Sequence, residues 1–67
     1  MWEYLSYSLE GINPAGVNVI RVFIKKDFIE ECFFLYYMVL PNDDIIISHA
    51  QDYIQKKNDY EQQLNLQ

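Results

Sequence analysis

The stretch VNVIRVFIK, residues 17–25, decides how the chain folds. β-branched and aromatic residues dominate it, and such a composition predicts a β-strand. Its side chains alternate between two sides, with Ile20, Val22 and Ile24 on one side and Val17, Val19 and Phe23 on the other, interrupted by Arg21. A strand that is apolar on both sides needs cover on both. We therefore expect this strand to be central in a sheet, with its second face covered either by the same chain or by another one.

The residues before this strand predict a partner strand and a turn. From Glu3 to Leu9 apolar and polar side chains alternate, which is typical of a half-buried strand over residues 3–9. Residues 11–16, GINPAG, then combine two glycines, a proline and an asparagine, the residue types that favour turns. The sequence therefore predicts two strands joined by a loop.

The segment after the central strand is ambiguous between strand and helix. Asp27 and Glu30 have the spacing of a helix capping box, whereas residues 32–40 consist mainly of strand-forming types. No polar face is available for a surface helix to turn towards water, so we predict a third strand over 32–40. Pro41 should end the segment in either case.

Residues 43–64 are predicted to form an amphipathic helix. Asn42 is a candidate N-cap, and Asp43 and Asp44 fall in the first turn, where the helix dipole favours acids. Apolar residues then recur at three- and four-residue steps, namely Ile46, Ala50, Tyr53, Tyr60 and Leu64. A competing helix start at Ser48 would leave residues 45–47 as a short fourth strand. Together these elements predict a single α+β domain over residues 1–67, a three-stranded (or four-stranded) antiparallel meander with one C-terminal helix packed on one face.

Composition limits how such a small domain can be stabilised. At 67 residues the core is small, and domains of this size usually add a disulfide, a metal or a partner chain. One cysteine and one histidine can make neither an internal disulfide nor a four-ligand zinc site. We therefore expect no cofactor and no metal, and we expect a partner chain, with a homodimer as the first expectation.

The charge balance and the absence of long apolar runs exclude other partners. Ten acids against five bases give a net charge of −5, and the bases form no cluster that could neutralise phosphates, which argues against direct nucleic-acid binding. The longest apolar run, residues 32–40, is about half the length that a membrane helix needs. The N-terminus lacks the features of a secretory signal, and with an unpaired cysteine this favours a cytoplasmic location.

The sequence contains few residues that could form a catalytic site. Cys32 and His49 are the one candidate nucleophile–base pair, and we expect Cys32 to be a small buried apolar residue and His49 a half-exposed helical one. A histidine three residues before Asp52 could also contribute two metal ligands, which is too few for a site. Neighbouring acid pairs do not converge across a cleft, and no phosphate-binding glycine loop is present. The sequence therefore predicts a protein that is not an enzyme.

Eleven aromatic residues exceed what a two-layer domain of this size can bury. Six of the eleven are tyrosines, which suit surfaces that are apolar in body and polar at the tip, and tyrosine and tryptophan are frequent in binding hot spots. The sheet face that the helix leaves bare should carry either Phe33, Leu35 and Tyr37 or Phe34, Tyr36 and Met38. Our candidate partner-binding residues are Trp2, Tyr4, Phe23, Phe33, Tyr36 and Tyr37.

Three functions fit these features. The first is a small protein–protein interaction module, adaptor or inhibitor, that binds a partner protein or itself through its aromatic surface. The second is an acidic mimic of nucleic acid, as in phage-type inhibitors of host proteins, with Glu30, Glu31, Asp43, Asp44, Asp52, Asp59 and Glu61 standing in for phosphates. The third is a small structural subunit of a larger assembly.

Overall fold

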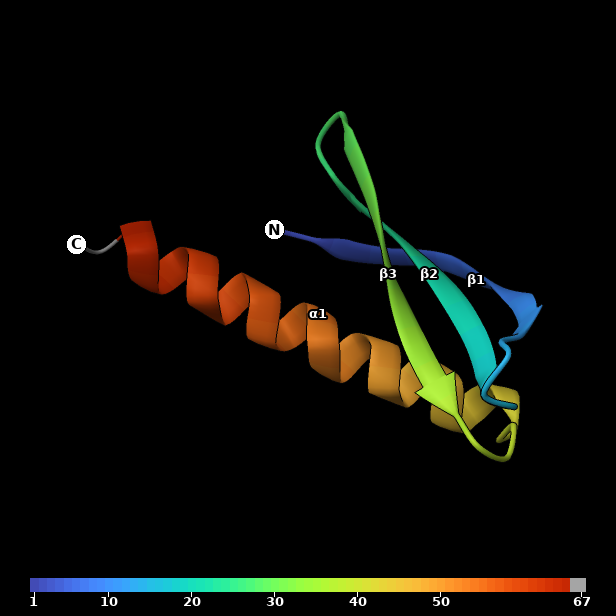
Figure 1. The fold of residues 1–67 in the computed structure, drawn as a ribbon. Helices are drawn as coiled ribbons and strands as arrows, with labels where there is room; N and C mark the ends of the chain where they lie inside the picture. The colour runs from blue at the N-terminus through green and yellow to red at the C-terminus, as the bar shows by residue number, and fades with distance from the viewer. Residues whose placement is uncertain (66–67) are drawn as a thin grey trace.

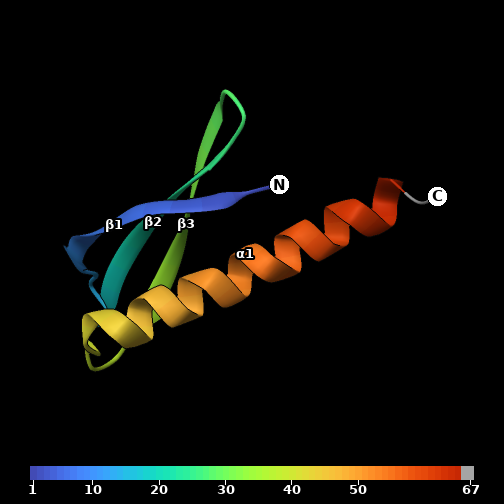
Figure 2. The ribbon, with the colours of Figure 1, turned by 180° about the vertical axis from the view of Figure 1, so that it is seen from behind.

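The computed structural model, which describes residues 1–65, shows three antiparallel strands followed by one helix. The strands are β1 (Glu3–Ile12), β2 (Asn18–Lys26) and β3 (Ile29–Tyr37), and the helix is α1 (Asp43–Asn65). The sheet order is β1-β2-β3, and α1 runs across one face of it (Figures 1 and 2). The predicted α+β meander with a helix on one face is confirmed, and residues 45–47 belong to α1 and not to a fourth strand.

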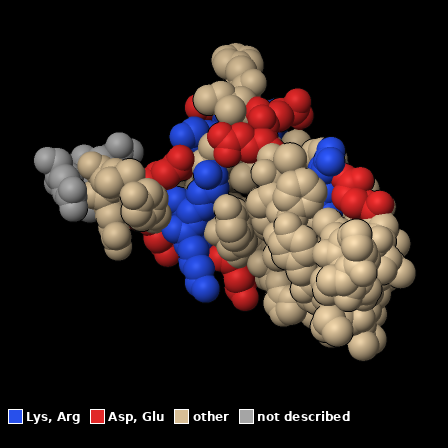
Figure 3. Space-filling model, in the orientation of Figure 1, with Lys and Arg blue, Asp and Glu red and all other residues tan. Residues whose placement is uncertain are grey.

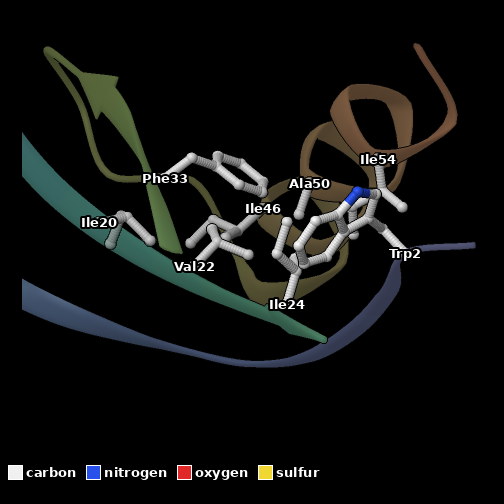
Figure 4. Close-up of a cluster of buried hydrophobic side chains, with 8 residues drawn as sticks. All are labelled: Trp2, Ile20, Val22, Ile24, Phe33, Ile46, Ala50 and Ile54. Atoms are coloured by element: carbon white, nitrogen blue, oxygen red, sulfur yellow. The ribbon is translucent and has the colours of Figure 1, made fainter. Parts of the chain in front are cut away.

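The predicted central strand occupies the middle of the sheet. Ile20, Val22 and Ile24 on β2 are almost fully buried, and they meet Ile46, Ala50 and Ile54, which recur every four residues along α1. Trp2 and Phe33 complete the buried cluster (Figure 4). The predicted apolar face of α1 is therefore right in part. Ile46 and Ala50 are buried as expected, whereas Tyr53, Tyr60 and Leu64 remain substantially exposed.

The third strand begins and ends three residues earlier than the predicted 32–40. β2 and β3 are joined by Asp27 and Phe28 alone, and Asp27 has a φ of 55°, a left-handed conformation that aspartate tolerates better than most residues. The strand ends at Tyr37 because its partner there, Asn18, is the first residue of β2. Met38, Val39 and Leu40 therefore form part of the connection to α1, and Pro41 does not mark the end of the strand.

β1 is longer than predicted and irregular. Its pairing with β2 shifts between Tyr4 and Ser6 and again between Leu9 and Gly11, whereas the pairing of β2 with β3 runs unbroken from Ile29 to Tyr37. The first shift has a consequence for the core. It lets Tyr4 and Tyr7 lie opposite Ile24 and Val22, so both tyrosines pack against the helix side of the sheet.

The N-terminal segment is attached to the far end of α1. The side-chain amide of Asn58 accepts a hydrogen bond from the Trp2 amide (2.7 Å) and donates one to the Trp2 carbonyl (3.1 Å). The Trp2 indole Nε1 donates to both carboxylate oxygens of Glu61, at 3.0 and 2.7 Å, and Lys26 lies 3.5 Å from the same carboxylate. These contacts join three elements at one end of the molecule.

Candidate interaction surface

The sheet face away from α1 is divided into a polar half and an apolar half. On the β1 side this face carries Ser6 and Ser8, which pair with Phe23 and Arg21 of β2. Arg21 forms an ion pair with Glu10, and its guanidinium lies 5.4 Å from the centre of the Phe34 ring. The charges of Arg21 and Glu10 in the polar half therefore compensate each other within the sheet.

The apolar half lies along β3 and continues into the connection to α1. We call it the β3 patch and define it by five residues whose exposed fractions range from 40% to 84%: Phe34, Tyr36, Met38, Val39 and Leu40. Partly buried Val19 and Phe23 of β2 border it on the same face. Figure 3, which looks onto this face, shows a broad surface without charged side chains over the end of the sheet where β3 finishes. No charged residue occurs between Cys32 and Asn42 in the sequence.

The structure decides which of the two alternating aromatic sets faces away from the helix. Phe34 and Tyr36 do, whereas Phe33, Leu35 and Tyr37 face α1. Phe33 is 8% exposed and stacks on Tyr53 with 3.8 Å between ring centres. The hydroxyl of Tyr37 lies 2.8 Å from Nδ1 of His49. Burial among apolar side chains raises the pKa of Tyr37 above its ordinary value.

The six candidate binding residues are therefore dispersed. Tyr36 and Phe23 lie on the uncovered face, and Tyr36 is the more exposed of the two. Trp2 is 4% exposed, so our expectation that it is a surface contact does not agree with the structure. Tyr4, Phe33 and Tyr37 pack on the helix side of the sheet, because the strand pairing turns them towards α1. Phe34 and Met38 belonged to one of the two alternating sets but not to the six candidates, and Val39 and Leu40 belonged to neither, because a strand predicted to residue 40 gave these two no special position.

The acids of the alternative function do not form one surface. Asp43 and Asp44 are in the first turn of α1, whereas Asp59 and Glu61 are near its other end. Several are engaged within the chain: Asp43 accepts a hydrogen bond from Tyr7, Glu31 lies 3.5 Å from Lys57, and Asp59 accepts one from Gln55 at 2.9 Å. The bond to Asp43 raises the pKa of Tyr7 to about 12.

The candidate catalytic groups lie on opposite sides of the sheet. Cys32 pairs with Phe23 and is exposed on the uncovered face, so the expectation that it is buried is wrong. The residues that follow it, Phe33 to Leu35, are apolar, but alternation along the strand turns Cys32 away from the core. His49 is on α1, against Tyr37 on the other side. Within residues 1–65 no group of three or more metal-binding side chains comes together.

An open hollow beside the N-terminal segment offers no reactive pair either. It is an open depression of about 600 Å³ between the N-terminal segment and α1, lined by Met1, Trp2, Glu3, Tyr4, Gln51, Ile54, Gln55 and Asn58. Glu3 is the sole charged side chain among these residues. Amides, apolar groups and one carboxylate can bind polar ligands weakly but supply no nucleophile with a base.

Comparison with known proteins adds no further constraint: no protein-family model, no curated protein and no solved structure matches the chain. Within residues 1–65, no helix has the length and apolar content needed to cross a bilayer.

Proposed function

We propose that this chain is a non-enzymatic protein-binding module that docks through the β3 patch. One observation carries the proposal: Phe34, Tyr36, Met38, Val39 and Leu40, all within residues 34–40, expose 40–84% of their surface. Contiguous apolar surface of this kind is uncommon on monomers and marks interaction sites. Removal of such apolar surface from water favours association.

Tyr36 is the residue that we expect to contribute most within the patch. It is 62% exposed, and a tyrosine supplies a large apolar area together with a hydroxyl that can find a partner at an interface. Phe34 beside it is held by the Arg21 guanidinium, which limits the freedom that the ring would lose on binding. We place this binding in the cytoplasm as part of the proposal, because the exposed Cys32 thiol persists most readily in a reducing compartment.

A binding experiment with matched variants tests the proposal. The chain is immobilised, exposed to source lysate, and the captured protein is identified by mass spectrometry, purified and titrated. We expect Tyr36→Asp and Met38→Asp to weaken binding at least about tenfold, which corresponds to about 1.4 kcal/mol. Ser8→Asp is the control, since it adds the same charge to the same sheet face but on the β1 side.

The same titration separates this proposal from the acidic mimic. An apolar docking surface keeps most of its affinity as salt rises, whereas a mimic of nucleic acid loses affinity steeply. Equal weakening by Ser8→Asp and Tyr36→Asp, or a partner released by moderate salt alone, would count against docking through the β3 patch.

A further inference from the structure

We infer that the free edge of β3 pairs antiparallel with β3 of a second copy of this chain, about a two-fold axis near Phe34, so that the β3 patches of the two copies adjoin on one face of a six-stranded sheet. The inference rests on the proposed function, because two residues of the β3 patch, Phe34 and Tyr36, lie on the strand that pairs and contact the neighbouring copy across the new strand pair. Four features of the molecule support it.

The two edges of the sheet differ in how they are protected. β1 carries two register shifts and so presents an irregular edge, a common device against unwanted strand pairing. β3 is regular over all nine residues and contains neither proline nor lysine. Among residues 1–65, one β3 backbone group takes part in a hydrogen bond outside the strand ladders, the Tyr37 carbonyl, which accepts from Asn18. β3 is therefore the edge open to another strand.

The distribution of charged residues along β3 allows this edge to pair with β3 of a second copy. The chain has a net charge of −5, so two copies repel each other, and a contact that also brought acids together would add to this repulsion. The acids of β3, Glu30 and Glu31, are confined to its beginning, and residues 32–42 carry none. In an antiparallel pair centred near Phe34, Glu30 of one copy lies opposite the segment from Tyr36 to Met38 of the other. A parallel pair would place like charges together.

The molecule also exposes more surface than a monomer of its mass. It has 5060 Å² of accessible surface, against about 4,500 Å² expected for 8.1 kDa. This excess of roughly 550 Å² includes the turns of α1 that extend past the sheet (Figure 1), and it is comparable with the roughly 600 Å² that each partner contributes to a specific interface at the lower end of the usual range.

The chain is also more extended than a compact domain of its length. The radius of gyration is 13.4 Å, whereas a compact domain of this length has about 11 Å. Figures 1 and 2 show the reason, because the later turns of α1 extend past the sheet. One free cysteine provides no disulfide to compensate for a small core.

Sedimentation equilibrium of the full chain up to roughly 100 µM tests the inference, since association follows mass action. We expect a species of twice 8.1 kDa. Tyr36→Lys in the strand and Val39→Lys in the loop should raise the dimer dissociation constant at least about tenfold, and Ser8→Lys should change it less than about twofold. All three variants change net charge from −5 equally, so bulk repulsion cannot account for a difference between them. Circular dichroism confirms that each is folded, and Val39→Lys lies outside the strands.

Cross-linking of introduced cysteines tests the direction of pairing. In a Cys32→Ser background, a short bifunctional maleimide should join Glu30→Cys chains to Met38→Cys chains in a mixture. Neither variant should link efficiently to itself. Self-linking of Glu30→Cys would overturn the antiparallel arrangement.

A monomer at the highest concentration would overturn the inference, and so would equal loss of the dimer in Ser8→Lys and Tyr36→Lys. A monomer that still binds a purified protein through the β3 patch would remove the dimer and leave the proposed function standing. A dimer with no patch-dependent partner beyond itself would uphold the inference and confine the proposed function to self-association.

Discussion

Trp2 shows how one residue position depends on distant structure. Strict alternation from residue 2 to residue 9 would put Trp2 and Tyr7 on opposite faces of the sheet, yet both lie on the helix side, because the irregular pairing near Leu5 inserts one extra residue. The indole lies beside Ile24 and Ile54 (Figure 4). The ammonium groups of Lys26 and Lys57 lie 5.1 and 4.9 Å from the ring centre. Sequence alternation carries no sign of such a bulge, so this burial could not be predicted from the residues alone.

Replacement of this side chain should strongly destabilise the fold. We expect Trp2→Ala to lower the free energy of unfolding by about 3–5 kcal/mol, because it removes a buried aromatic ring and the indole donor that bonds to Glu61. That loss rivals the whole stability of a domain of this size, so the variant should be largely unfolded. Urea denaturation followed by circular dichroism, at one protein concentration, measures it. Tyr60→Ala, which removes a ring that is 63% exposed, is the control and should change stability by less than about 0.5 kcal/mol. Similar stability of the two variants would contradict the role assigned to Trp2.

At the scale of elements, the sequence predicted the number, order and type of strands and helix. The β-branched composition of β2 and the capped start of α1 were strong local signals, and both elements are in place within one residue of the prediction. The prediction placed β3 three residues too late. The turn before it consists of Asp27 and Phe28 and lacks the Asn-Gly or Asp-Gly pair that indicates a tight hairpin. The choice between Phe33 and Phe34 as the exposed ring depended on that displacement and on the pairing with β2, which no local pattern supplies.

The loop between β1 and β2 owes its shape largely to Asn13. The side-chain oxygen of Asn13 accepts hydrogen bonds from the amides of Ala15 and Val17, each at 3.0 Å, and its backbone pairs with Gly16 and Val17. We expect Asn13→Ala to lower the free energy of unfolding by about 1–2 kcal/mol, because two backbone donors lose their partner. Pro14→Ala in the same loop should have a smaller effect, since Pro14 is exposed and takes part in none of these bonds. Parallel urea titrations of the two variants distinguish them, and an equal loss would show that loop stiffness, and not the Asn13 hydrogen bonds, stabilises the turn.

At the scale of the whole molecule, Glu61 connects parts of the chain that are far apart in sequence. The hydrogen bond from the Trp2 indole holds the pKa of Glu61 below its ordinary value of 4.5, and Lys26 and Lys57 act in the same direction. Burial opposes them in part. Because the folded state favours the ionised carboxylate, this contribution to stability is fully present above pH 4.5 and is lost as the pH falls through the lower folded pKa.

The expected outcome is a loss of folding stability on acidification that Glu61→Gln reduces. We expect the wild type to lose more stability than the variant between pH 6 and the acid limit, with Glu61→Gln the less stable of the two near neutrality. Thermal unfolding at a series of pH values gives the comparison. Asp52→Asn, at an exposed acid on α1 away from the edge of β3, serves as control and should follow the wild type. Parallel pH profiles for the wild type and Glu61→Gln would show that the Trp2–Glu61 bond does not favour the ionised form.

The attachment of Trp2 to Asn58 and Glu61 also bears on how the chain reaches its fold during synthesis. The hydrogen bonds join residues 56 and 59 positions apart, so the start of the chain must wait for residues made much later. Until then the β-meander lacks the helix that buries Ile20, Val22 and Ile24. Contacts of such sequence separation slow folding and leave apolar surface open to aggregation in the meantime. A nascent chain halted before residue 58 should therefore depend on chaperones far more than the finished domain does.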